Sequence, residues 1–286
     1  MLTILQAIIL GLLQGLTELF PISSLGHSVI IPSVLGWNIK QDDPYFITFL
    51  VATHLATATV LLLFFWKDWW NVAKGLARSF MAREIKPNDT YAKLGWLLVV
   101  ATVPAGIMGL LLQDQLRQLF ATAQIAAAFL IINGIVLFSA ERLRRRKATK
   151  HEENESDVNI AKLSWTAAIG IGLAQAGALI PGISRSGSSM AGGLLAGLDN
   201  ADAARFSFLL ATPIIGAAAV LKLPELFQPA ARPVLQATVI GALCAAVAAY
   251  VSVRFLVKYF ETRNLNIYAS YCVLAGIVFS TILLIR

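Results

Sequence analysis

The sequence predicts an all-α integral membrane protein with an inverted-topology repeat, in which six spanning helices accompany two re-entrant helical hairpins. The first observation behind this prediction is composition: 57% of the 286 residues are hydrophobic and 14% are charged, whereas soluble domains carry about 25% charged residues. The second is a pair of long apolar stretches that proline interrupts. The third is a set of short motifs that recurs about 160 residues later in the chain.

Six further apolar runs are each close to the roughly 20 residues that a spanning helix needs. In chain order they cover residues 46–66, 94–112, 120–140, 206–222, 234–254 and 267–285. The charged intervals between them, including 67–93, are expected to be loops. Two lone cysteines, Cys244 and Cys272, lie in apolar runs, so we expect neither a disulfide nor a metal site from them.

Two further apolar segments are broken in the middle. Pro21 interrupts residues 1–35, and Pro181 with Gly182 interrupts residues 163–198. A proline removes a backbone donor and clashes with the preceding helical turn, so a helix ends there. Each arm is too short to span a bilayer. We therefore expect both segments to be re-entrant hairpins.

Three motifs recur in the same order and at nearly constant separation. The pairs are Gly11-Leu12-x-Gln14 with Gly172-Leu173-x-Gln175, Ile22-Ser23-x-x-Gly26 with Ile183-Ser184-x-x-Gly187, and Phe49-Leu50-x-Ala52-Thr53 with Phe208-Leu209-x-Ala211-Thr212. They divide a single membrane domain, 1–286, into a first repeat (1–141), a charged cytoplasmic loop (142–159) and a second repeat (160–286). Because each half has three spans, an odd number, the second half is inverted relative to the first. Inverted repeats of this kind bring their helix breaks together near the middle of the membrane.

The basic residues predict the orientation. If both hairpins are re-entrant, most of the 23 Lys and Arg residues fall on one side, which should be the cytoplasm. Both termini then lie outside. The run Arg144–Lys147 fits topology and anionic lipid better than nucleic acid, because it lies just beyond an apolar span. We therefore expect no nucleic-acid partner.

The two breaks carry chemistry that apolar segments rarely contain. Gln14 and Glu18 share one helix face, and an ionisable group at membrane depth indicates function. Arg185 has a planar fork that fits phosphate oxygens, and helix N-termini after each break favour anions. The sequence therefore predicts a phosphate site. Its further candidates are Ser23, Ser24, His27, Ser184, Ser186 and Ser189.

Each candidate also has a structural interpretation. Glu18 could be a buried acid paired with Arg185, His27 could be a satisfied helix histidine, and serines at breaks often cap helices. His54 lies on an otherwise apolar span, and we interpret it as structural. His151, on a charged loop, is interpreted as solvated.

The stretch 14–27, QGLTELFPISSLGH, resembles the first signature of the undecaprenyl pyrophosphate phosphatase family, also called the bacitracin-resistance family. The stretch 181–189, PGISRSGSS, resembles its second signature, and 204–213 resembles the segment that follows. The resemblance implies a bacterial inner-membrane enzyme that removes the terminal phosphate of a C55 isoprenyl pyrophosphate on the outer-facing side. Such enzymes recycle the carrier lipid of peptidoglycan synthesis and confer bacitracin resistance. A homodimer fits the family.

Carried over by motif position, the catalytic core is Glu18, Ser24, His27 and Arg185, with Gln14, Ser23, Ser184, Ser186 and Ser189 binding substrate. The nucleophile is Ser24 or His27; one short stretch holds hydroxyl, imidazole and carboxylate, which favours Ser24. The family often has Glu at the position of Gln14, so Glu18 is the only acid of the motif here. Glu18 is therefore the candidate ligand for the Mg²⁺ or Ca²⁺ that the family implies, and no organic cofactor is expected. The alternative function is a transporter or flippase of isoprenyl phosphates that uses the same anion site.

Overall fold

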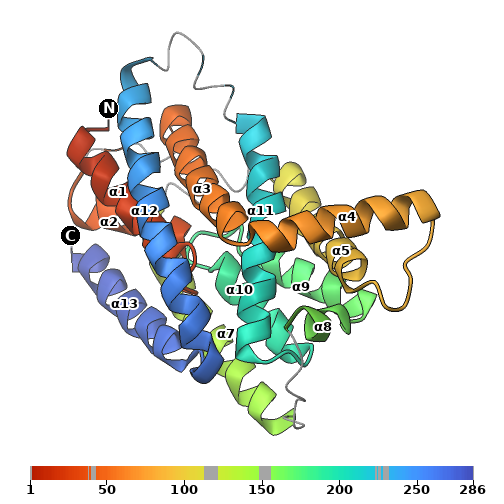
Figure 1. Cartoon of the computed structure of the whole chain (residues 1–286). Coiled ribbons are helices and arrows are strands. Elements are labelled where there is room, and N and C mark those ends of the chain that lie inside the picture. Colours follow the sequence, from red (N-terminus) through yellow and green to blue (C-terminus); the bar gives the residue numbers. More distant parts are fainter. Residues whose placement is uncertain are drawn as a thin grey trace.

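The computed structural model describes residues 2–37, 39, 43–112, 122–147, 156–222, 224, 227 and 232–285, and in these residues the secondary structure is helical, without strands. Six helices are long and apolar enough to cross a membrane, and Figure 1 shows their bundle. They are α3 (Pro44–Phe64), α5 (Thr90–Leu111), α7 (Ala123–Lys147), α11 (Asn200–Lys222), α12 (Arg232–Thr262) and α13 (Asn266–Ile285). The predicted all-α membrane class is confirmed.

Both broken segments form a pair of short helices. The first pair is α1 (Ile4–Thr17) and α2 (Ser24–Val34), and the second is α9 (Trp165–Gly177) and α10 (Arg185–Leu195). Thr3 and Gln6 form a reciprocal capping box at the start of α1, which satisfies two donors that a helix end leaves free. With 11 to 14 residues each, these arms are shorter than a spanning helix.

Two segments differ from the predicted loops. Residues 67–93 contain α4 (Trp66–Ala82), because their apolar residues recur at helical spacing between the lysines and arginines; a search for continuous apolar runs overlooks such a helix. The segment 142–159 is helical at both described ends, where α7 continues through Lys147 and the short α8 (Ser156–Ala161) begins.

In each half, one short helix packs against a long helix of the other half. The first arm, α1, packs along α12 of the second half, and α9 packs along α5 of the first half. Equivalent glycines make both contacts close: a Cβ on Gly11 would lie 2.2 Å from the Gly241 carbonyl oxygen, and one on Gly172 would lie 2.5 Å from that of Ala101. Small residues let membrane helices approach in this way. The reciprocal pairing agrees with a repeat; its inverted orientation stays a prediction.

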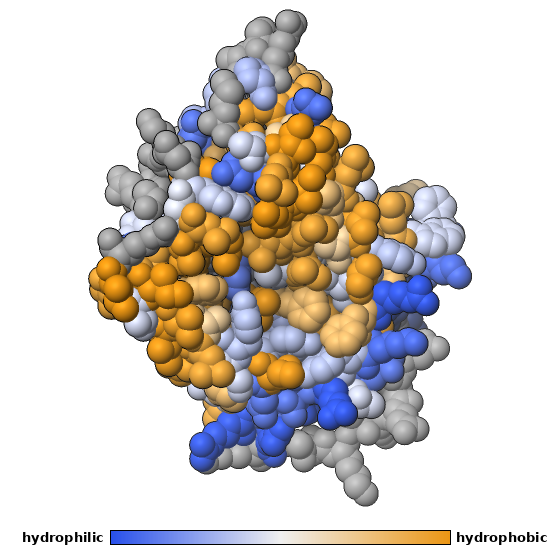
Figure 2. Space-filling model, turned by 90° about the vertical axis from the view of Figure 1, so that its left-hand side faces the viewer, coloured by the Kyte–Doolittle hydropathy of each residue, from blue (hydrophilic) through white to orange (hydrophobic). Residues whose placement is uncertain are grey.

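The surface has the character of a membrane protein. Figure 2 shows apolar side chains over much of one face and hydrophilic ones gathered toward its lower edge. On α12, Val239, Leu243 and Val247 are each more than half exposed. Their spacing of four places them on one side of the helix. This side of α12 is suited to lipid rather than water.

Candidate active site

The two helix breaks touch one another inside the bundle. Ser23 Oγ donates to the carbonyl oxygen of Ile183 at 3.1 Å, and Ser186 Oγ donates to that of Phe20 at 3.3 Å. A Cβ on Gly26 would lie 2.9 Å from Gly182 Cα, so glycine is needed on this contact. The sequence expectation that the two breaks meet is thereby confirmed.

Asn133, in the middle of α7, holds both breaks at once. Its Nδ2 donates to the Pro21 carbonyl oxygen at 3.0 Å, and its Oδ1 accepts from the Ser184 backbone N–H at 3.0 Å. Helix breaks leave backbone groups without intrahelical partners, and burying them unpaired would be costly. One buried amide side chain therefore satisfies a backbone group from each repeat and fixes the distance between the repeats.

The first break also holds an unusual backbone conformation. Ser23 has φ 70°, a left-handed value that non-glycine residues rarely adopt. Its Oγ accepts from the Gly26 backbone N–H at 3.1 Å and so caps α2. Strained residues of this kind persist where the surroundings over-determine them. The strain turns the chain so that Ser24, the first residue of α2, faces the end of α1.

Glu18 is the centre of the site. Its carboxylate is 4% exposed and accepts from five donor atoms. Arg185 donates to Oε1 from Nη2 at 2.9 Å and from Nε at 3.1 Å. Oε2 is 2.5 Å from Ser24 Oγ, 3.1 Å from Gln14 Nε2 and 3.2 Å from His54 Nε2. The side chains of Arg185 and His54 are the more accessible members, 14% and 16% exposed, so a ligand would approach Glu18 from their side.

His54 belongs to this cluster, although the sequence interpretation made it structural. Its Nδ1 lies 2.7 Å from the Leu50 carbonyl oxygen, which can only accept, so Nδ1 carries a proton. A hydrogen bond from Nε2 to Glu18 then requires a second ring proton, which makes the contact charge-assisted. Nε2 also lies 3.4 Å from Ser24 Oγ. The sequence pattern that singled out Glu18, an ionisable group within an apolar segment, also applies to His54 and would have indicated a site residue.

His27 occupies a different environment from Glu18, Ser24 and Arg185. Its ring is buried; Nδ1 lies 2.7 Å from the Ser23 carbonyl oxygen and Nε2 lies 2.8 Å from the Tyr271 hydroxyl. The ring also stacks on Tyr271, with centroids 5.8 Å apart. In this arrangement His27 supports the backbone just before Ser24.

The remaining predicted serines line the second break and bond within the fold. Ser184 Oγ accepts from the Gly187 backbone N–H and lies 3.1 Å from Ser186 Oγ. Ser189 Oγ donates to the Arg185 carbonyl oxygen and lies 2.7 Å from Ser207 Oγ. These hydroxyls shape the start of α10, from which Arg185 reaches Glu18.

The side chains around Glu18 do not fit a resident divalent cation as its ligands. Both oxygens of Glu18 already accept hydrogen bonds, and the Arg185 guanidinium repels a cation there. Gln14 Oε1 is a buried acceptor without a partner, but Mg²⁺ and Ca²⁺ require several oxygen ligands. Among the described residues no group of three or more His, Cys, Asp or Glu side chains could hold a metal ion.

Comparison with known proteins agrees with the two signatures. The sequence profile of the bacitracin resistance protein BacA matches residues 7–278. A protein of Acidiphilium cryptum named undecaprenyl-diphosphatase is 46% identical, with 96% of each chain covered. One of the same name from Mycolicibacterium paratuberculosis is 44% identical over 95% of this chain and 94% of its own. This chain belongs to the BacA family of bacitracin resistance proteins.

Proposed function

We propose that this chain is a membrane phosphatase that hydrolyses undecaprenyl diphosphate to undecaprenyl phosphate and inorganic phosphate. The observation that carries the proposal is the cluster of Glu18, Ser24 and Arg185, formed where the two family signatures meet. The names of full-length relatives at 44–46% identity support the same activity. In the cell this reaction would return the carrier lipid to peptidoglycan synthesis and remove the target of bacitracin.

Arg185 is suited to binding the terminal phosphate. Its guanidinium is permanently charged and its fork matches two phosphate oxygens. The N-terminus of α10, where Arg185 lies, adds a positive dipole end. Together they would stabilise negative charge that develops on the phosphoryl group in the transition state.

Ser24 is the nucleophile that this arrangement favours over His27. Ser24 Oγ is 2.5 Å from a carboxylate oxygen that can take its proton, whereas the ring nitrogens of His27 bond to Ser23 and Tyr271. In the proposed step a bond forms between Ser24 Oγ and the terminal phosphorus, and the bond from that phosphorus to the bridging oxygen breaks. The electron pair leaves with undecaprenyl phosphate, and Glu18 passes the serine proton to it. Water then hydrolyses the phosphoserine, with Glu18 again accepting a proton and Ser24 Oγ regaining one.

His54 would act beside Glu18 as a donor. When protonated it would place a second positive charge beside Glu18 and Ser24, where it can offset the negative charge of a bound phosphoryl group. Its Nε2–H can also donate to a phosphate oxygen bound near Ser24. Any divalent cation used in the reaction would enter with the diphosphate, since Mg²⁺ is commonly held by substrate phosphates with one or two carboxylates.

The finer cellular assignments rest on the charge distribution and the family resemblance. We place the protein in the bacterial inner membrane with the Lys- and Arg-rich loops in the cytoplasm, both termini outside and the site open to the outer side. A homodimer is proposed from the resemblance alone. Reporter fusions at each terminus test the orientation, and light scattering of the purified protein tests the dimer.

Phosphate release from undecaprenyl or farnesyl diphosphate by the purified protein tests the proposed activity. The wild type is compared with Arg185→Ala, each with and without Mg²⁺ and Ca²⁺. The proposal requires release by the wild type and its loss in the variant. A folded wild type that binds the lipid diphosphate but releases no phosphate with either ion would refute it and favour transport.

A further inference from the structure

Helix α4 leaves α3 at a sharp corner and crosses the direction of α3 and α11 in Figure 1. Phe65 forms the corner, ending α3 and starting α4. The buried side of α4 consists of Val72, Gly75 and Ser79, and it packs on α5. At its first turn Asp68 pairs with Arg205 of α11 at 2.8 Å. These contacts fix the rotation of α4 about its axis and so decide which side chains face outward.

The outward side of α4 carries large apolar side chains beside its lysines. Trp66, Trp70 and Phe80 are 57%, 59% and 75% exposed, and their spacings of four and ten residues place them on neighbouring parts of one face. Large exposed apolar groups on a helix that runs beside spanning segments are typical of helices lying in the membrane interface. Tryptophan in particular is enriched at that level of the bilayer.

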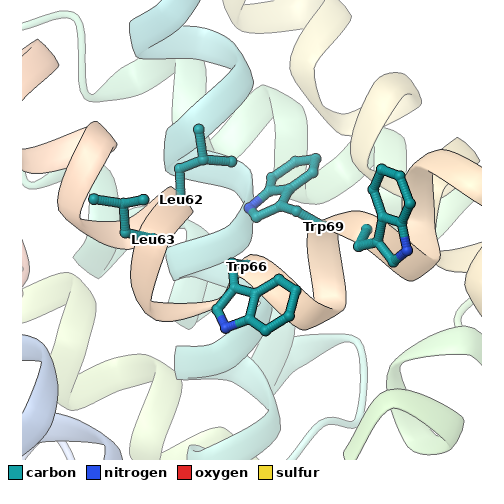
Figure 3. Close-up of a pocket in the computed structure, with 5 residues that line it drawn as sticks. Leu62, Leu63, Trp66 and Trp69 are labelled. Atoms are coloured by element: carbon teal, nitrogen blue, oxygen red, sulfur yellow. The ribbon is translucent and has the colours of Figure 1, made fainter.

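A pocket of about 440 Å³ lies at the corner between α3 and α4. Leu62, Leu63, Trp66, Trp69 and Trp70 line it, and Figure 3 shows their side chains around the corner. The indole Nε1 of Trp69 is buried and has no hydrogen-bond partner in the described part of the chain. Because this nitrogen is itself buried, the surface that the pocket offers to a ligand is apolar.

Two lysines flank this pocket. Lys67 Nζ lies 5.9 Å from the centroid of the Trp66 ring, and Lys74 Nζ lies 4.9 Å from that of Trp70. The two lysines are two helical turns apart, so they share a face. No carboxylate of the described residues pairs with either, whereas Arg78 is neutralised by Asp89 at 3.0 Å. The positive charge of Lys67 and Lys74 is therefore available to an anion at the rim of the pocket.

We propose that the α3–α4 corner binds an anionic phospholipid of the surrounding leaflet. One acyl chain would occupy the pocket of Leu62, Leu63 and Trp66, and the headgroup phosphate would lie between Lys67 and Lys74. An apolar pocket alone would accept any lipid chain; the unpaired lysines make the site selective for negative charge. Each basic residue near an anionic membrane surface contributes about a fivefold gain in binding to it. This site is separate from the Glu18 cluster and does not depend on the proposed catalytic activity.

Tryptophan quenching by brominated lipids tests the proposal. Purified protein is reconstituted in vesicles of equal amounts of phosphatidylglycerol and phosphatidylcholine, with the brominated chain on one or the other lipid. The wild type should be quenched more strongly by brominated phosphatidylglycerol. Lys67→Gln/Lys74→Gln should abolish this excess, whereas Lys86→Gln/Lys258→Gln, which removes the same charge from exposed positions elsewhere, should keep it. The excess should fall in Trp66→Phe/Trp70→Phe, in which Trp69 is the remaining tryptophan of the pocket, and persist in full in Trp165→Phe.

Equal quenching of the wild type by both lipids would overturn the proposal, since the corner would then hold boundary lipid without selectivity. An excess that survives in Lys67→Gln/Lys74→Gln would also overturn it, because the anionic lipid would then bind elsewhere. Raising the salt concentration should reduce the wild-type excess, since exposed charges are screened. An excess independent of salt would contradict an electrostatic headgroup contact.

Discussion

Arg185 and Glu18 lie 167 residues apart in the sequence, yet the guanidinium donates two hydrogen bonds to a single carboxylate oxygen, at 2.9 Å and 3.1 Å. The pair joins the start of α10 to the end of α1. It therefore forms only when both repeats have folded and their breaks have met. The charges that would bind and activate a phosphate are thus assembled by the fold as a whole rather than by one local motif.

Glu18→Gln should reduce phosphate release by about two to four orders of magnitude. The amide cannot accept the Ser24 proton, and loss of a general base has effects of that size. The measurement is kcat/KM for farnesyl diphosphate in detergent, with Glu84→Gln, at an exposed loop position, as the control. Near-normal turnover of Glu18→Gln would remove Glu18 from the mechanism.

The same substitution, Glu18→Gln, leaves Arg185 without its counter-ion. Its effect on stability can therefore be measured apart from its effect on catalysis. Breaking one side of a buried pair costs about 3–5 kcal/mol, so Glu18→Gln should lower the thermal unfolding temperature. The double variant Glu18→Gln/Arg185→Gln should recover much of that stability and remain inactive. Recovery of activity together with stability would mean that the pair only holds the fold.

His54 should contribute through the positive charge of its protonated ring. His54→Gln retains a donor toward Glu18 but carries no charge, whereas His54→Ala removes both. If the charge stabilises the phosphoryl group in the transition state, both variants should lose turnover to a similar extent, about a hundredfold, with little change in KM. Comparing kcat of the two variants checks this, and near-normal kcat in His54→Gln would reduce His54 to a neutral hydrogen-bonding role.

The sequence predicted the membrane class, the six spans and the two broken pairs, because continuous apolar runs and prolines act locally. It also predicted that Glu18, Ser24 and Arg185 lie together, since polar groups in apolar segments need partners. Helix α4 was overlooked because its apolar residues alternate with lysines and arginines. The site neighbours of His54 depend on how α3 packs beside the breaks, which no local pattern encodes.

The roles of Asn133 and His27 show the same limit of local patterns. Asn133 is one amide in an apolar run, and its main partners are backbone groups of Pro21 and Ser184, which have no residue signature. His27 carries the motif position of a catalytic residue, yet its partner Tyr271 lies 244 residues away on α13. Partners of this kind become visible only in three dimensions.

Asn133→Leu should weaken both the fold and the site. It leaves the Ser184 N–H buried without its partner, at about 1–3 kcal/mol, and the Pro21 carbonyl with only its 3.7 Å contact to Cys272 Sγ. A shift of about 1 Å between the two breaks would reduce turnover by about a hundredfold. Asn133→Asp keeps the acceptor for Ser184 and should be less severe. Thermal unfolding and kcat/KM are measured beside Ser252→Ala, which removes another buried hydrogen-bonding side chain on α12; equal effects in Asn133→Leu and Ser252→Ala would contradict the bridging role.

Two glycines of α9, two residues apart, offer a matched test of how the short arms pack. A Cβ on Gly172 would lie 2.5 Å from the Ala101 carbonyl oxygen, whereas one on Gly170 would meet nothing within 4 Å. Gly172→Ala should therefore push α9 away from α5 and cost about 1–3 kcal/mol. Gly170→Ala should be neutral or stabilising by up to about 1 kcal/mol, because alanine favours helix. Since α10 follows α9 and carries Arg185, Gly172→Ala should also lower phosphate release, and similar unfolding temperatures for the two variants would contradict close packing of α9 on α5.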